Sequence, residues 1–157
     1  MSKILIITDA WEPQVNGVVV TMTTIVKKLK ERGYKVDVIH PGLFHTFPLP
    51  NYPEISVAWN FWDLKKKIQK SDPDYIHISV EGPLGLTGRH YCLEHKIPYS
   101  SAIHTKFPEY VYERFNIGLD VTKGLLKWFH NSATVSYTHL RAHETVLDLV
   151  CRLLLEK

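Results

Sequence analysis

Apolar residues open the chain in a pattern that changes from strand to helix and back to strand. Residues 3–8 form a continuous β-branched apolar run, which is typical of a strand covered on both faces of a parallel sheet. Apolar positions then recur at helical spacing, at Val18, Met22, Ile25 and Leu29. Gly33 supplies a C-terminal cap, and residues 34–39 form a second apolar run. This order predicts a β-α-β unit with a right-handed crossover.

The alternation of strands and helices continues along the chain. The expected elements are, in order, a strand at residues 55–58, a short helix capped by Asn60 and Asp63, a strand at 75–80, a helix at 83–96, a strand at 97–103 and a helix from Val121. Most of residues 40–60 is expected to form loops, because its prolines cannot pair within a central strand. The pattern predicts an α/β fold built on a parallel sheet.

Composition places the chain among ordinary globular proteins. It has 157 residues, of which 22% are charged and 45% hydrophobic, so one domain is expected. The net charge of +3 is too small to predict nucleic-acid binding, although it is compatible with an anionic ligand or a lipid surface. The sequence has neither a signal-peptide pattern nor an apolar run of about 18 residues. Together with the count of two cysteines, these features predict a cytoplasmic protein.

Two loops that follow predicted strands could bind a phosphate group. The first begins at Asp9 and contains Gly17 where a helix starts, and the second is the glycine-containing turn at residues 81–85. Backbone N–H groups at such helix starts attract anions at the carboxyl edge of a parallel sheet. Each loop also has a plain structural interpretation, in which Asp9 caps its loop and the glycines only shape turns. The sequence lacks the glycine spacing of dinucleotide sites and of P-loops.

A third candidate follows the predicted strand at residues 97–103. His104, Thr105 and Lys106 combine an imidazole, a hydroxyl and an ammonium group, which can bind phosphate or hydrogen-bond a reacting sugar hydroxyl. The alternative is a histidine that neighbouring polar groups satisfy. The other histidines show no metal-ligand spacing, so no metal site is predicted.

Lysines and aromatic residues gather in residues 60–70. The cluster consists of Phe61, Trp62, Lys65, Lys66, Lys67 and Lys70. Such a helix can lie on anionic lipid, where each basic residue near the surface contributes about 1 kcal/mol. The alternative is a solvated lysine face on an ordinary helix of an α/β fold. We therefore expect at most weak peripheral membrane contact.

Several segments, in a fixed order, give the chain a family resemblance. They are ITDAWEPQVNGVV, HPGLFHTFPLPNYPEI, DYIHISVEGPLG, IHTKFPEYV and LLKWFHNSAT. Together they resemble the N-terminal half of retaining glycosyltransferases of family four with the GT-B fold, near bacterial mannosyl- and glucosyltransferases that act on lipid or glycan acceptors. The resemblance covers residues 3–134. It implies a Rossmann-like, acceptor-side domain with helices on both faces of a parallel sheet.

The resemblance also implies roles for residues in the three loops. Asn16 and Gly17 would lie near the donor diphosphate, and His104 would be the catalytic histidine. The cleft residues on the acceptor side would be Asp9, Glu81, Thr105 and Lys106. Such enzymes use a nucleotide-diphosphate sugar as co-substrate, need no metal or other cofactor and bind the donor with a second Rossmann-like domain. We therefore expect this chain alone to transfer no sugar.

A different function remains as the alternative. The chain could form a small non-enzymatic α/β ligand-binding module or a receiver-like signalling domain, with Asp9 in an acidic pocket. Receiver chemistry requires acidic residues at the ends of both the first strand and a central strand. The predicted central strand instead ends in Ser79, Val80 and Glu81, which disfavours this alternative.

The C-terminal residues have a second, unrelated resemblance. Residues 135–145 and 148–157 resemble one reading frame of a transposase-type sequencing adaptor. Residues 135–145 also interrupt the alternation where a strand is expected, because they carry two histidines and Arg141. We therefore expect a truncated GT-B-type domain at residues 1–134 and a non-native tail at 135–157. The alternative is an amphipathic terminal helix at residues 146–155.

Overall fold

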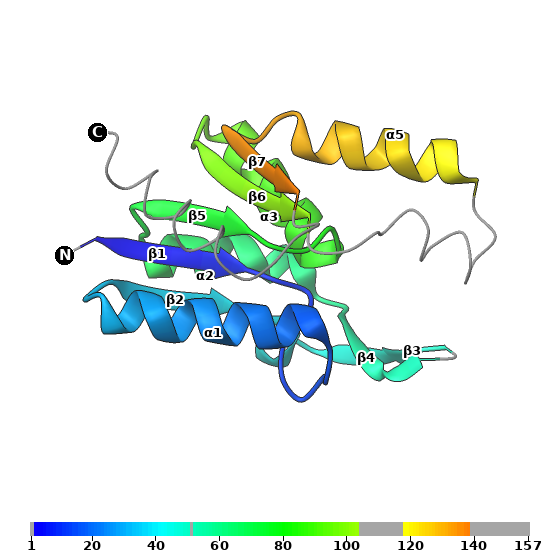
Figure 1. Ribbon diagram of the computed structural model, residues 1–157, viewed down its shortest axis with the longest axis horizontal. Helices are drawn as coiled ribbons and strands as arrows, with labels where there is room; N and C mark the ends of the chain where they lie inside the picture. The colour runs from blue at the N-terminus through cyan, green and yellow to red at the C-terminus, as the bar shows by residue number, and fades with distance from the viewer. Residues whose placement is uncertain (1, 51, 104–117, 139–157) are drawn as a thin grey trace.

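A five-stranded parallel sheet forms the centre of the protein in the computed structural model, which describes residues 2–50, 52–103 and 118–138. The strand order is β2-β1-β5-β6-β7, and every pair is parallel. The strands are β1 (Lys3–Ile7), β2 (Lys35–Ile39), β5 (Tyr75–Ile78), β6 (Tyr99–Ile103) and β7 (Val135–Thr138). Each crossover carries the chain back to the same end of the sheet, so all five strands point the same way (Figure 1).

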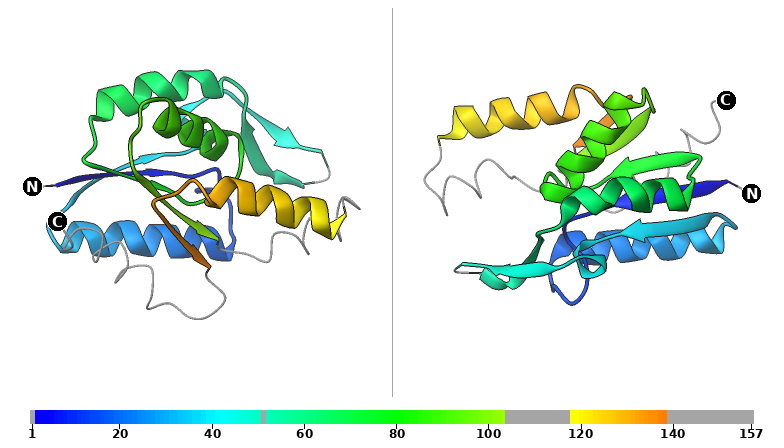
Figure 2. Two further views of the ribbon diagram at one scale, coloured as in Figure 1. Left: turned by 90° about the horizontal axis from the view of Figure 1, so that it is seen from above. Right: turned by 180° about the vertical axis from the view of Figure 1, so that it is seen from behind.

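Helices cover both faces of this sheet. They are α1 (Gly17–Glu31), α2 (Leu64–Ser71), α3 (Pro83–Glu94) and α5 (Leu119–His130). Figure 2 shows α1 on one face and α2 with α3 on the other. This arrangement confirms the predicted α/β, Rossmann-like fold with a parallel sheet and helices on both faces.

Two separate hydrophobic cores hold the layers together. Ile4 and Ile6 of β1 point toward α1, where they pack with Met22 and Leu29. The alternate β1 positions pack on the other side with α2 and α3, in a cluster that also contains Phe129 of α5. Because successive strand residues point to opposite faces, one apolar run supplies both cores. This explains why the sequence shows a continuous run rather than an alternating one.

Proline-rich residues between β2 and α2 form an antiparallel hairpin outside the main sheet. Its strands are β3 (Thr46–Leu49) and β4 (Tyr52–Ala58), and it extends beyond the ends of β1 and β2 (Figure 1). The expectation of loops through most of residues 40–60 is therefore wrong. Pro48 and Pro53 are tolerated because both strands of a two-stranded sheet are edge strands.

The start of α2 also differs from the prediction. A 3₁₀ turn at Phe61–Asp63 precedes the helix, and Asn60 makes no side-chain cap. Its Oδ1 instead accepts the His45 N–H at 2.8 Å, while its Nδ2 donates to Asp63. The Asn60 side chain therefore connects this turn to the start of β3 by hydrogen bonds.

The last strand corrects the expectation for the C-terminal segment. β7 pairs with β6, with Ser100 opposite Val135 and Ile103 opposite Thr138. A strand therefore follows α5 where the alternation requires one, and the interpretation that the pattern breaks at Val135 is wrong for these positions. Residues 139–157 lie outside the described residues, and the proposed adaptor origin stays a prediction. Within the described residues, no helix has the length and apolar character needed to cross a bilayer.

Candidate functional site

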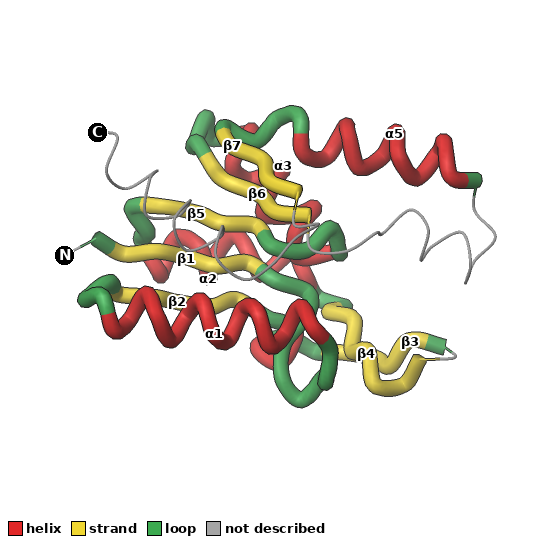
Figure 3. Tube along the Cα trace, in the orientation of Figure 1, coloured by secondary structure: helices red, strands yellow, loops and turns green. Residues whose placement is uncertain are grey.

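The candidate residues lie at the carboxyl edge of the sheet, where the strands end and loops lead into the helices. Figure 3 shows the loops after β1 and β5 at this edge, with the N-terminus of α1 beside them. In parallel α/β sheets this is the edge at which ligands bind. His104, Thr105 and Lys106 fall outside the described residues, although Ile103 at the end of β6 brings the chain to the same edge.

The N-terminus of α1 is capped by Asn16. Its Oδ1 accepts the Val19 N–H at 3.0 Å, and its extended backbone leads into Gly17 at the first helical position. An Asn cap of this kind satisfies one of the N–H groups that a helix leaves unpaired at its start. The N–H groups of the next residues, together with the helix dipole, make this end attractive to an anion.

Gly17 has no packing reason to be glycine. A Cβ built at this position meets no atom within 4 Å among the described residues, and its backbone is not in the left-handed region. Neither conformation nor crowding requires a glycine here. The open space instead permits a ligand to approach the backbone closely, which favours the binding interpretation of this loop over a plain turn.

At the loop of residues 81–85, the protein's own Asp9 takes the place that a ligand could occupy in front of the helix. Both oxygens of Asp9 accept backbone N–H groups at the start of α3, from Leu84 and Gly85 at 2.9 Å each. The anion position at this helix start is therefore occupied by a carboxylate of the protein itself. A Cβ at Gly82 would lie 2.3 Å from the Asp9 carboxyl carbon, so this glycine admits the carboxylate and the plain structural interpretation holds for this loop.

Burial raises the pKa of Asp9 from 3.8 to about 6, because the ionised form loses solvation. The backbone N–H groups of Leu84, Gly85 and Gly82 act against this rise, and the charge of Glu81 adds to it. Asp9 thus changes its charge closer to neutral pH than a solvated carboxylate does.

The raised pKa predicts a pH dependence of stability. The folded protein holds the Asp9 proton more tightly than the unfolded chain does, so the contribution of Asp9 is fully present below about pH 4 and is lost as the pH rises past about 6. The measurement is the free energy of unfolding in urea for wild type and Asp9→Asn between pH 3.5 and 7.5. We expect the wild-type advantage to shrink through this window. A difference that stays constant with pH would show that Asp9 does not titrate there.

A buried hydrogen-bonded array joins three elements next to Asp9. His130 Nε2 lies 2.8 Å from Glu81 Oε1, and His130 Nδ1 lies 2.7 Å from Ser101 Oγ. The side chains of His130 and Glu81 are 5% and 9% exposed. The array fixes the end of α5 to β6 and to the loop after β5. His130 is the residue that sequence reasoning missed, because a lone histidine at the end of a helix gives no signal of its partners.

This order of serine, histidine and carboxylate invites comparison with a hydrolase triad. Ser101 is 0% exposed, so its hydroxyl cannot reach a substrate. A nucleophilic serine must meet the carbonyl carbon that it attacks. The array therefore has a structural role at this edge of the sheet rather than a role in nucleophilic catalysis.

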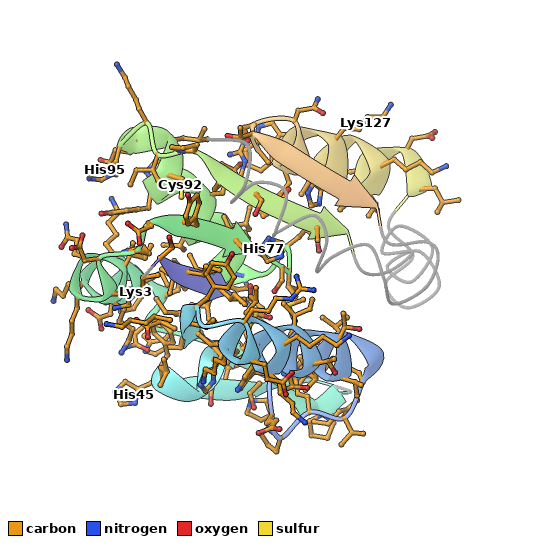
Figure 4. All side chains as sticks on the ribbon, turned by 60° about the vertical axis from the view of Figure 1, so that its left-hand side comes forward. Lys3, His45, His77, Cys92, His95 and Lys127 are labelled. Atoms are coloured by element: carbon orange, nitrogen blue, oxygen red, sulfur yellow. The ribbon has the colours of Figure 1, made fainter. Side chains whose placement is uncertain are left out.

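Other reactive side chains lie away from this edge. Figure 4 shows Cys92 and His77 inside the protein and His95 and Lys127 at its surface. Burial raises the pKa of the Cys92 thiol to about 12, which keeps it protonated and unreactive. Among the described residues, no group of three His, Cys, Asp or Glu side chains is placed to hold a metal ion.

Comparison with known proteins gives one family match and one similar protein. The family described as Glycosyltransferase Family 4 matches residues 15–139, which include Asn16, Gly17, Glu81 and the strand β7. An alpha-monoglucosyldiacylglycerol synthase from Streptococcus pneumoniae (strain ATCC BAA-255 / R6) is 28% identical over 124 residues, covering 70% of this chain and 28% of that protein. The chain therefore spans little more than a quarter of the length of this relative.

Proposed function

Because this chain belongs to glycosyltransferase family 4, we propose that it forms the acceptor-side half of a retaining hexosyltransferase. The enzyme would move a sugar such as mannose or glucose from a GDP- or UDP-linked donor to a lipid or glycan acceptor. The observation that carries the proposal is the family match, which extends over Asn16, Gly17, Glu81 and residues 104–106 of the candidate loops and begins after Asp9. The name of the pneumococcal relative describes the synthesis of a glucosylated diacylglycerol, which supports a lipid acceptor.

The N-terminus of α1 is the proposed contact for the donor diphosphate. Asn16 holds the helix start in place, and Gly17 leaves open space in front of it. Backbone N–H groups and the positive helix end would then stabilise the charge that develops on the leaving diphosphate. This contribution is electrostatic and needs no metal ion, so we propose that the enzyme works without one.

Of the remaining candidate residues, some would contact the substrates and others would hold the surrounding loops in place. We propose that His104 is the catalytic residue and that Thr105 and Lys106 contact the acceptor. Asp9 and Glu81 would fix the loops on the acceptor side of the cleft, since Asp9 caps the start of α3 and Glu81 is hydrogen-bonded to His130. A second, donor-binding domain would complete the cleft, and without it the chain would transfer no sugar.

The assay for the proposed activity is transfer from GDP- and UDP-sugars by a whole family member that contains this sequence, with the chain alone measured beside it. We expect turnover with a lipid or glycan acceptor for the whole protein and none for the chain. His104→Ala is expected to abolish transfer. A lack of transfer from all common GDP- and UDP-sugars, or unchanged activity in His104→Ala, would contradict the proposal.

Gly17→Ala separates the proposed donor role from a structural one. Because a Cβ here meets nothing within 4 Å, we expect the free energy of unfolding to stay equal or to rise by up to about 1 kcal/mol. In the whole enzyme, the added methyl group would obstruct the diphosphate and raise the donor KM at least tenfold. Gly124→Ala on α5, which also has open space, is the matched control and should leave KM unchanged. An unaltered donor KM in Gly17→Ala would place the diphosphate elsewhere.

Membrane contact is proposed through an aromatic patch that consists of Trp59, Phe61 and Trp62. These side chains are 59%, 39% and 54% exposed, and their rings contact one another at centroid distances of 5.6 Å. Aromatic side chains of this kind favour the boundary between lipid and water. The patch lies at the start of α2, so the predicted lysines are close to it in the chain.

The lysines of α2 are less available than the sequence suggests. Lys65 Nζ lies 2.7 Å from Glu94, Lys66 Nζ lies 3.5 Å from Asp63, and Lys67 lies over the Phe44 ring. These partners compete with lipid headgroups for the same ammonium groups. We therefore propose that the aromatic patch supplies most of the contact and that the lysines add a modest preference for anionic lipid.

The aromatic patch predicts which substitutions release the protein from vesicles. The double substitution Trp59→Ser and Trp62→Ser is expected to lower binding to anionic vesicles by about tenfold or more, since it removes the exposed indoles. Lys66→Ala with Lys70→Ala should lower it only a few-fold, and only at low salt. Co-sedimentation with vesicles measures both. Equal binding of the wild type to neutral and anionic vesicles would contradict the lysine contribution.

A further inference from the structure

A hollow of about 170 Å³ lies at the carboxyl edge of the sheet, outside the set of residues discussed so far. Three segments meet there, namely the loop after β1, the 3₁₀ turn after β2 (Pro41–Leu43) and the hairpin of β3 and β4. The hollow is lined by Trp11, Glu12, Pro13, Gln14, Pro41, Gly42, Thr46 and Ser56. Pockets for drug-sized molecules occupy about 300–1,000 Å³, so this one admits a single ring or a small headgroup rather than a nucleotide sugar.

The lining combines one aromatic face with neutral hydrogen-bonding groups. Trp11 supplies the indole, Gln14 an amide, and Thr46 and Ser56 hydroxyls, while Glu12 is the only charged residue in the lining. The absence of a cation among these lining residues disfavours a phosphate. A polyol matches the set, because its C–H face can lie on the indole while its hydroxyls both donate and accept.

The hairpin register explains how the two hydroxyls face the hollow. Thr46 pairs with Ala58, and Pro48 pairs with Ser56, so Thr46 and Ser56 lie on one face of the hairpin. Phe47 pairs with Val57 on the opposite face, where it is exposed. The face of the hairpin that carries these two hydroxyls therefore lines the hollow.

The His40 ring lies beside two lining residues, Trp11 and Gly42, without itself lining the hollow. The His40 ring stacks on Trp11 at a centroid distance of 5.6 Å, and its buried Nδ1 has no hydrogen-bond partner among the described residues. A Cβ at Gly42, which lines the hollow, would lie only 3.1 Å from this nitrogen. Burial lowers the pKa of His40, against the effect of Glu12, which favours the neutral ring beside Trp11.

The hollow is connected to the proposed donor end of α1. Gln14 is 8% exposed, and its Oε1 accepts a hydrogen bond from Asn16 Nδ2 at 3.3 Å. The backbone N–H of Gln14 also donates to Trp11 O at 3.1 Å, which closes the loop around the hollow. A ligand in the hollow would therefore lie next to the loop that holds the donor diphosphate.

We propose that this hollow, which we call the Trp11 pocket, binds one polyhydroxylated ring or headgroup of the acceptor. The proposal rests on the proposed function, because it names the chemical class of the acceptor at that site. The polar part of the acceptor enters between the loop after β1 and the hairpin. Gln14, Thr46 and Ser56 hydrogen-bond its sugar-like hydroxyls, and its apolar face lies on Trp11.

The test is a titration of the 157-residue chain with methyl α-glucopyranoside, glycerol and, below its micelle concentration, octyl β-glucoside, followed by backbone and indole N–H signals in NMR. We expect shifts of the Trp11 indole and of the Gly42, Thr46 and Ser56 amides. Trp11→Ala should weaken binding at least tenfold, whereas Trp11→Phe should retain most of it. The joint substitution of Thr46→Val and Ser56→Ala should weaken it several-fold without changing the fold.

Trp62→Ala is the matched control, because it removes an indole from the aromatic patch instead of the Trp11 pocket. It should not alter binding of methyl glucopyranoside. Tighter binding of octyl β-glucoside that Trp62→Ala abolishes would assign the pocket to a lipid headgroup, and equal binding of the two glucosides would assign it to a free glycan.

Two results would overturn the proposal. One is the lack of shifts in the Trp11 pocket at the highest soluble concentration of every polyol. The other is binding of choline in place of polyols, since an indole beside Glu12 could also hold a cation. Sugar transfer by the whole enzyme is measured separately: transfer without polyol binding would contradict only this inference, and polyol binding without transfer would contradict only the proposed function.

Discussion

Replacing Gly85 with alanine is expected to destabilise the protein by about 3 kcal/mol or more, at the upper end of the cost of overpacking. A Cβ at this position would lie 1.9 Å from the carbonyl oxygen of Val80 and 3.1 Å from its carbonyl carbon. Backbone cannot yield as a flexible side chain does, so α3 must shift away from the end of β5. The shift would also pull the Gly85 N–H away from Asp9. Urea unfolding followed by circular dichroism measures the loss.

Gly124→Ala is the matched control for Gly85→Ala. Gly124 lies in α5, and its added Cβ meets no described atom within 4 Å. The substitution should stabilise the helix by up to about 1 kcal/mol, because alanine is the better helix former. If both variants unfold at the same urea concentration, the close approach of α3 to the Val80 carbonyl does not exist in solution.

Removing His130 is the second substitution for which we expect a large effect. His130→Ala leaves Glu81 and the Ser101 hydroxyl buried without their partner, and breaking a buried pair costs about 3–5 kcal/mol. Thermal and urea unfolding at pH 7.5 measure the loss.

A double-mutant cycle tests whether the loss comes from the Glu81 pair. Glu81→Gln combined with His130→Ala should cost less than the sum of the two single substitutions, since the buried charge is removed together with its partner. His45→Ala is the matched control, because the side chain of His45 is exposed and only its backbone N–H binds Asn60. Additive losses in the cycle would mean that the pair contributes no coupling energy.

The order of strands and helices could be predicted because each element carries its own period. The apolar run of β1 and the helical spacing of α1 are local patterns, and the structure places both as expected. The predicted strand at residues 55–58 is confirmed as part of β4, but its partner β3 was missed because the rule that excludes proline was applied as though only central strands existed. Pro48 and Pro53 lie in a separate two-stranded sheet, which no local pattern distinguishes from a loop.

The candidate site was predictable in its position but not in its contacts. A polar residue at the end of a strand marks the carboxyl edge, which identified Asp9 and Glu81. Their partners are far along the chain, with Asp9 binding backbone 75 residues away and Glu81 binding a histidine 49 residues away. Sequence spacing does not encode such pairs, so neither the capping of α3 by Asp9 nor the role of His130 could be read in advance.

The register of the hairpin determines together which side chains face the Trp11 pocket and which face solvent. Because side chains alternate along β3, inserting one residue before Thr46 would turn Phe47 toward the Trp11 pocket and Thr46 toward solvent, while Ser56 on β4 would keep its place. A single length change would thus fill the pocket with a ring and remove one of its two hydroxyls. We expect the strands of this hairpin to tolerate an insertion of two residues better than an insertion of one, while the turn between them can vary in length.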